Sequence, residues 1–197
     1  MKCERLFIVI FLVSVLLFTT IGFKAEGGNA RGELEKIGYT YNENSFVDCA
    51  KKGDLEAAKL FLAEGMDINV QNERGQTALM RAAEYQRAEV VTLLLENGAD
   101  VNVKSNKNRR TALMEAASTG NLAIIKQLAA RGAGINDRDY TNNTALQFAC
   151  IWGHAEAVSQ LIKLGAKPDL RGEQGRTPMM VAQQNGHTEI VTILKDA

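Results

Sequence analysis

Apolar residues recur along most of the chain in short runs whose spacing predicts pairs of short helices. In the segment 89–96 (EVVTLLLE), the valines and leucines fall on one side of a helix and form an apolar stripe. In the segment 77–83 (TALMRAA), Leu79 and a pair of alanines do the same, and Thr77 suits the N-cap position. Helices of about nine residues do not persist alone in water, so we expect neighbouring helices to stabilise one another by packing.

The pattern of helix pairs is repeated along the chain at intervals of 33 or 34 residues. One column of the repeat reads TALM, TALM, TALQ and TPMM, starting at Thr77, Thr111, Thr144 and Thr177. A second column ends in Asn or Asp and starts at Gly65, Gly98, Gly132 and Gly165. One period before Thr77, Asn44 opens a fifth, degenerate copy. A fixed period of this kind predicts a stack in which each copy covers the apolar side of its neighbour.

A period of 33 residues with the motif Thr-Pro/Ala-Leu-x-x-Ala resembles the ankyrin repeat. The resemblance covers about residues 43–197 and implies an all-α solenoid of stacked helix-turn-helix units with extended finger loops. The expected repeats are about 43–71, 72–104, 105–138, 139–171 and 172–197. In the third copy the finger has an extra residue and Arg109 replaces its glycine, so we expect this finger to be distorted.

Residues 1–23 have the layout of an export signal. They open with a basic stretch, and the run that follows is apolar as far as Phe18 except for Ser14. Counted to Phe23, the run has 18 residues, which just reaches the length of a membrane span. A cleaved signal gives a periplasmic or secreted protein. An uncleaved segment anchors the chain in a membrane through residues 6–23, and a buried strand is the third alternative.

Residues 24–42 are expected to form a linker between the export segment and the repeats. They mix glycine, charged residues and asparagine with little apolar periodicity, and a short helical turn around residues 33–37 is compatible with this composition. The basic flank of an export segment stays inside, so we expect the repeats to lie outside the cytoplasm.

Composition favours binding over catalysis or nucleic-acid recognition. The chain has 23 basic and 23 acidic residues, and a net charge of zero argues against a dedicated nucleic-acid binder. The two histidines, His154 and His187, each stand in Gly-His-x-Glu at a turn, where ankyrin repeats often use histidine to bind the next finger. Cys49 and Cys150 occupy alanine positions and are expected to be small buried side chains. We find no zinc-binding spacing and no phosphate-binding glycine motif, so we predict no cofactor, no metal site and no catalytic residue.

The resemblance to ankyrin repeats places partner binding on the concave side, at the finger tips and the exposed ends of the first helices. Carried over by position, the expected binding residues are Arg74, Gln76, Tyr85, Lys107, Arg110, Tyr140, Asn143, Ile151, Trp152 and Arg176. Trp152 is the only tryptophan and the repeat core does not need it, although it could instead pack over the helix turn. The basic finger from Lys104 to Arg110 is either a solvated charge run or a contact for an acidic patch on a partner.

The sequence therefore predicts a monomeric, non-enzymatic module that binds an unidentified protein. In one form of this hypothesis the module is exported and soluble. In the alternative form it is a membrane-anchored adaptor or scaffold in the cell envelope. The difference between the two lies entirely in the fate of residues 1–23.

Overall fold

The computed structural model describes residues 29–197, and within this range the chain forms eleven α-helices and no strands. Ten of the helices make five pairs, which are α3 (Glu43–Lys52) with α4 (Leu55–Ala63), α5 (Ala78–Glu84) with α6 (Ala88–Glu96), α7 (Ala112–Thr119) with α8 (Leu122–Ala130), α9 (Ala145–Trp152) with α10 (Ala155–Lys163), and α11 (Pro178–Gln184) with α12 (Thr188–Lys195). The remaining helix, α2 (Ala30–Lys36), precedes the first pair. The predicted all-α solenoid is confirmed.

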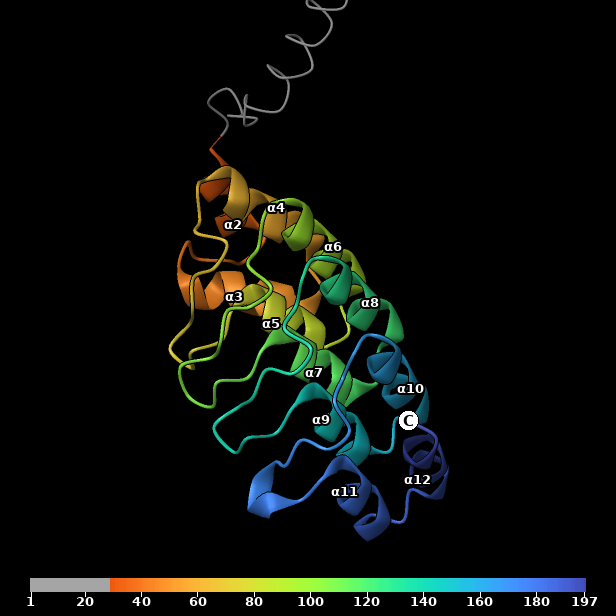
Figure 1. Ribbon diagram of the computed structural model, residues 1–197. Helices are drawn as coiled ribbons and strands as arrows, with labels where there is room; N and C mark the ends of the chain where they lie inside the picture. Colours follow the sequence, from red (N-terminus) through yellow and green to blue (C-terminus); the bar gives the residue numbers. More distant parts are fainter. Residues whose placement is uncertain (1–28) are drawn as a thin grey trace, which may run out of the picture.

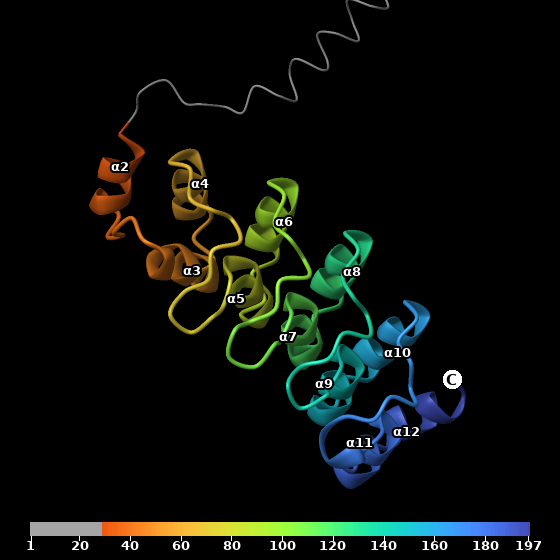
Figure 2. The same cartoon turned by 60° about the vertical axis from the view of Figure 1, so that its left-hand side comes forward.

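The five pairs stack so that their helices form two rows (Figures 1 and 2). The first helices α3, α5, α7, α9 and α11 contact one another in that order, and so do the second helices α4, α6, α8, α10 and α12. Loops that connect one pair to the next project from the row of first helices as fingers (Figure 2). The last finger contains a short 3-10 helix, η1 (Glu173–Gly175).

The repeated threonine column starts the first helices of the last four repeats. The Oγ1 atom of Thr77 accepts a hydrogen bond from the backbone N–H of Met80 at 3.2 Å, and Thr111 and Thr177 make the same cap. The turn between the two helices of a pair needs a residue in the left-handed conformation. This residue is glycine in four repeats and Gln86, with φ of 59°, in the other.

Small residues in the first helices let neighbouring repeats approach closely. The alanine pair of α5, Ala82 and Ala83, is fully buried, as is the corresponding pair of α7. The second helices contribute larger side chains, and Ile124, Ile125 and Leu128 of α8 are also fully buried. Burying a side chain of that size contributes about 1.5–3 kcal/mol relative to leaving it exposed. Stability therefore comes mainly from contacts between repeats.

The two cysteines in the described residues lie in this core. Cys49 and Cys150 occupy alanine positions, and both are buried and free. Burial is the main cause that raises the pKa of each thiol to about 12. Protonated, buried thiols behave as small apolar side chains, which confirms the prediction made for both residues.

A column of three asparagines, just before the fingers, joins the first four repeats to one another. Asn102 accepts a hydrogen bond from a backbone N–H of the next repeat at 2.9 Å and donates to a backbone carbonyl there at 3.2 Å. Asn136 makes the same two bonds one repeat later, at 2.9 and 3.0 Å. Asn69 accepts one such bond at 2.9 Å. In the fourth copy the position is taken by Asp169, which makes no hydrogen bond of this kind within residues 29–197.

Residues 30–42 pack on the first repeat and do not form the expected linker (Figure 1). Helix α2 lies against α4, and its Leu34 is fully buried. Tyr39 and Tyr41 follow, and both rings pack on Phe61 with centroids 6.1 and 5.8 Å away. The segment covers apolar side chains of the first repeat that would otherwise face water. The prediction of a linker is therefore wrong for these residues.

The export segment expected at residues 1–23 lies outside the described residues, and so does the start of the linker, residues 24–28. Within residues 29–197, no helix has both the length and the apolar character needed to cross a membrane.

The finger of the third copy closes normally despite its extra residue. The backbone N–H of Ser105 donates to the carbonyl of Arg110 at 2.9 Å, as Asn72 does to Gln76 at 3.0 Å in the preceding finger. Arg109 adopts the left-handed conformation, with φ of 58°. The expected distortion is absent, and the finger instead holds a non-glycine residue in a conformation that costs about 1–2 kcal/mol.

Candidate partner-binding surface

The fingers and the first helices form one face of the stack, which we call the finger face. It consists of the fingers 71–76, 104–110, 137–143 and 170–176 and the helices α3, α5, α7, α9 and α11 with their C-cap residues, such as Tyr85. Figure 2 shows the fingers projecting in a row beside the first helices, away from the second helices. The residues expected to bind a partner all belong to this face.

Hydrogen bonds join neighbouring fingers into a row. The backbone N–H of Asn106 donates to the carbonyl of Gly75 at 3.2 Å, and that of Tyr140 donates to the carbonyl of Asn108 at 3.0 Å. The side-chain oxygen of Asn143 accepts from a backbone N–H of the last finger at 3.1 Å. The finger tips are therefore fixed relative to one another before a partner binds, which lowers the entropic cost of binding.

Three aromatic side chains are exposed on the finger face. Trp152, at the end of α9, and Tyr140, on the fourth copy's finger, are each 62% exposed, and Tyr85, just after α5, is 38% exposed. The exposure of Trp152 disfavours the alternative in which its ring packs over the helix turn. Exposed tryptophan and tyrosine are the residue types that most often dominate the energetics of protein interfaces.

Tyr85 and Trp152 are separate anchors on this face. Tyr85 and Trp152 occupy the same repeat position in alternate repeats, and Thr119 stands at that position between them. The ring of Tyr85 is flanked by two cations, Lys51 at 5.2 Å and Arg81 at 4.7 Å from its centroid. A partner that reached all three aromatic residues would therefore span several repeats.

Two of the expected binding arginines are restrained by contacts within the chain. The guanidinium of Arg110 lies 3.6 Å from Glu115 and 3.9 Å from Asp139. Burial raises the pKa of the Glu115 carboxyl, and the charge of Arg110 partly offsets this effect. Arg176 donates to the side-chain oxygen of Gln184 at 2.6 Å. Binding through either arginine requires a partner to compete with these contacts.

Three other expected binding residues are less accessible. Asn143 is only 6% exposed, and its amide donates to the hydroxyl of Thr141 at 2.9 Å while its oxygen holds the last finger. A side chain used in this way cannot contact a partner, so we remove Asn143 from the binding residues, which corrects the prediction. Gln76 and Ile151 are half-buried.

The fingers carry an excess of positive charge although the whole chain is neutral. Together they contain eight basic and four acidic residues. Lys104, Arg110 and Arg176 lie within ion-pair distance of acidic residues. Within residues 29–197, the finger cations in no ion pair are Arg74, Lys107, Arg109, Arg138 and Arg171. The finger face therefore presents a positive potential to a partner.

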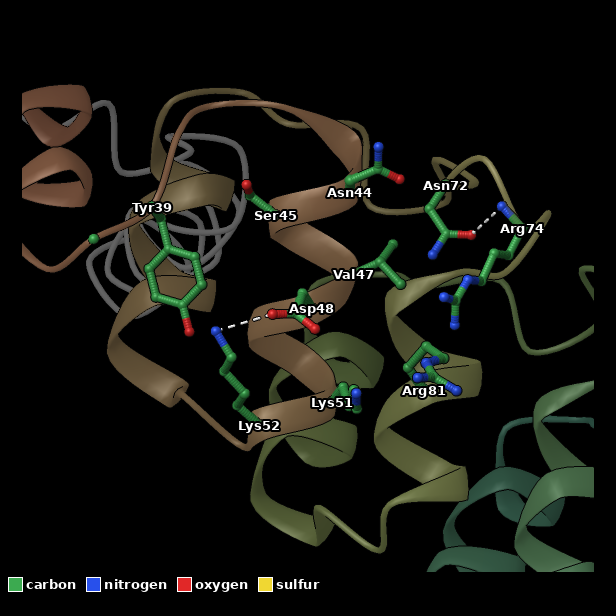
Figure 3. A pocket seen from close by; sticks show the side chains of 11 residues that line it. Tyr39, Asn44, Ser45, Val47, Asp48, Lys51, Lys52, Asn72, Arg74 and Arg81 are labelled. Carbon is green, nitrogen blue, oxygen red and sulfur yellow. Dashed lines mark hydrogen bonds and ion pairs between the residues drawn. The ribbon is translucent and has the colours of Figure 1, made fainter.

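A pocket at the N-terminal end of the finger face was not expected from the sequence. It has a volume of about 390 Å³ and lies between α3, α5 and the finger 71–76 (Figure 3). Its cationic lining includes Lys51, Arg74 and Arg81, which come from three separate segments. Only the stacking of the first two repeats brings these residues together, so neither motif nor spacing could have revealed the pocket.

The histidines are structural, but their partners differ from the expected ones. The Nε2 atom of His154 lies 3.0 Å from the carbonyl oxygen of Ser118, and that of His187 lies 3.3 Å from the carbonyl oxygen of Ile151. Each histidine thus holds the end of the first helix in the preceding repeat and not the next finger. In the described part of the chain, no group of three or more His, Cys, Asp or Glu side chains is placed to hold a metal ion.

Comparison with known proteins agrees with this architecture. The family model for ankyrin repeats (3 copies) matches residues 46–139 and 136–197. The chain is 32% identical over 152 residues to the ankyrin repeat and KH domain-containing protein mask-1 of Caenorhabditis elegans, covering 76% of this chain and 6% of the relative. It is 33% identical over 126 residues to the mouse B-cell lymphoma 3 protein homolog, covering 64% of this chain and 28% of the relative.

A bacterial relative matches over most of its length. The putative ankyrin repeat protein YahD of Escherichia coli is 28% identical over 187 residues, covering 76% of this chain and 93% of the relative. By contrast, the chain spans only a small part of the worm and mouse proteins. The family match covers most of the described residues and includes all five helix pairs except the first residues of α3. The chain therefore belongs to the ankyrin repeat family.

Proposed function

We propose that this chain is an exported module that captures a protein partner on its finger face. Ankyrin repeats bind protein partners and are typically interaction modules without catalytic activity. The observation that carries the proposal is the exposure of Tyr140 and Trp152 on this face, in a stack whose other large apolar side chains are mostly buried. Large aromatic side chains left in water at fixed positions favour a surface that another protein covers.

Export is proposed from the sequence of residues 1–23, with a basic start and an apolar run typical of a signal segment. A cleaved signal yields a soluble exported module. An uncleaved segment yields the second candidate, an adaptor held at a membrane. N-terminal sequencing of the mature protein distinguishes them, because a start near Phe23 excludes the anchor and an intact Met1 excludes the soluble form.

Partner capture tests the assignment of the surface. The full chain, tagged at its C-terminus and kept in non-ionic detergent, is compared with the double variant Tyr140→Ala, Trp152→Ala in a pull-down from the source cells. Truncating an aromatic hot spot costs about 2 kcal/mol or more, so we expect the double variant to lose its specific partner. Ile37→Ala is the matched control, since Ile37 is an exposed apolar residue outside the finger face.

Equal capture of every partner by the wild type and the double variant would remove the aromatic residues from the binding surface. Loss of capture by Ile37→Ala to the same extent would place the contact at the N-terminal end of the stack. Circular dichroism of each variant checks that it remains folded, which is expected because all three substituted side chains are exposed.

A further inference from the structure

We propose that the pocket between α3, α5 and the finger 71–76 anchors an acidic segment of the protein partner, through aspartate or glutamate carboxylates. The inference rests on the proposed function, because it names the chemistry of the partner that the finger face captures. The pocket is lined by the first two repeats and by Gly38 and Tyr39, which precede them. It lies near α3 and α5, at the end of the row of first helices away from α11 (Figure 1).

The charges that line the pocket are not balanced. Its one acidic residue, Asp48, is already paired with Lys52, whose Nζ atom lies 2.9 Å from the carboxylate. The cations Lys51 and Arg74 are in no ion pair within the described residues. The pocket therefore offers uncompensated positive charge, and a bound carboxylate would supply the missing counter-charge.

Arg81 gives the pocket a positioned guanidinium. Its side chain is only 9% exposed, one Nη atom is bound by Glu84, and the guanidinium lies 4.7 Å from the ring centroid of Tyr85. Within residues 29–197, its Nε and other Nη atoms donate to no protein acceptor. Neither atom is fully buried, so both can donate to a ligand. Because the side chain is already ordered, a carboxylate that used these donors would meet a small entropic cost.

The direction of the side chains supports an anion as the occupant. Figure 3 shows the side chain of Arg74 reaching from the finger toward Arg81 on α5, and Lys51 on α3 also lines the pocket. Like charges that converge in this way repel one another, and the repulsion is relieved when an anion lies between them. Glu84 pairs with Arg81 and Asp48 pairs with Lys52, so neither carboxylate compensates the charges of Lys51 and Arg74.

Size and surroundings favour a peptide segment over other anions. A volume of about 390 Å³ lies at the small end of ligand pockets and suits one or two side chains. The neighbouring finger continues the positive charge with Lys107 and Arg109, so an acidic segment can extend along the fingers. A single-stranded nucleic acid would stack its bases on aromatic rings, yet at this pocket the ring of Tyr85 is flanked by two cations and Tyr39 is buried.

Fluorescence anisotropy with the full chain tests the proposal directly. The probe is a labelled peptide in which Glu alternates with Gly, and its control is the same peptide with every Glu replaced by Gln. The variants are Arg74→Gln and Lys51→Gln in the pocket. The matched control variant is Lys126→Gln, which removes the same charge from an exposed position on the second-helix row.

We expect the Glu peptide to bind and the Gln peptide not to bind, with affinity falling as salt is raised. Each pocket variant is expected to weaken binding by about tenfold, which is the effect of losing one charge-assisted hydrogen bond. Lys126→Gln should change the affinity by less than about twofold, because Lys126 lies on the second-helix row and solvent screens its charge from the pocket.

Equal binding of the Glu and Gln peptides, or equal loss in Arg74→Gln and Lys126→Gln, would overturn the proposal. Tighter binding of a labelled single-stranded DNA, lost in the same pocket variants, would also overturn it and assign the pocket to nucleic acid. Failure of the peptide to bind, while capture of the protein partner still depends on Trp152, would refute this pocket and leave the proposed function standing. Loss of both dependences would refute the proposed function itself.

Discussion

The variant Asn136→Ala measures how much the asparagine column contributes to the stack. It removes two hydrogen bonds, at 2.9 and 3.0 Å, that join its repeat to the next one. A net hydrogen bond contributes about 0.5–1.5 kcal/mol, and water replaces part of that at a position with solvent access. We therefore expect the free energy of unfolding to fall by about 1–2 kcal/mol. For a chain of this length the loss lowers the Tm by about 2–8 °C.

Urea denaturation of the full chain, followed by far-UV circular dichroism in non-ionic detergent, gives the free energy of unfolding. Asn102→Ala should behave like Asn136→Ala, because it also loses two bonds to the next repeat. Asp169→Ala is the matched control at the same repeat position, and we expect a change of less than about 0.5 kcal/mol. If Asp169→Ala were as destabilising as Asn136→Ala, the effect would not come from bonds between repeats and the reasoning would be refuted.

Three further predictions concern the ends and the core of the stack. Leu34→Ala should lower the free energy of unfolding by about 2–5 kcal/mol in the same denaturation assay, because this side chain of α2 is fully buried where α2 packs on α4; no change would mean that α2 does not cap the repeats. Cys49 and Cys150 should not react with a thiol reagent until the chain unfolds, because burial raises the pKa of both thiols to about 12; rapid labelling of the native protein would contradict their burial. Burial also raises the pKa of Glu115, so the folded state binds the carboxyl proton more tightly than the unfolded state does. The protonated carboxyl therefore favours the folded state at low pH, and this stabilisation is lost as pH rises through the folded pKa. Glu115→Gln should therefore raise the Tm at neutral pH and lose this advantage below a pH of about 4.3; the opposite trend would show that the pair with Arg110 outweighs burial.

The repeat architecture could be predicted because its residue types return at fixed helix positions. Thr77 caps a first helix as expected, and the paired alanines after it are buried as expected. The N-terminal cap could not be found in the same way. Leu34 and Tyr41 stand outside the period, and nothing in the sequence connects Tyr41 with its stacking partner Phe61.

The candidate binding surface could be predicted only in part. Trp152 can be recognised because the repeat core does not need its side chain, and Tyr140 because it occupies a finger position that ankyrin repeats use for binding. Asn143 was assigned to the surface because sequence position does not show that its amide is already used between fingers. The pocket of Arg74 and Arg81 was missed because it forms only when two repeats stack.

Hydrogen–deuterium exchange of the full chain, alone and with its captured partner, tests most directly whether the finger face binds. We predict slower exchange in the fingers 104–110 and 137–143 and at the end of α9, with α6, α8 and α10 unchanged. Slower exchange confined to the second helices α6, α8 and α10 would contradict the account, because the partner would then bind the opposite side of the stack.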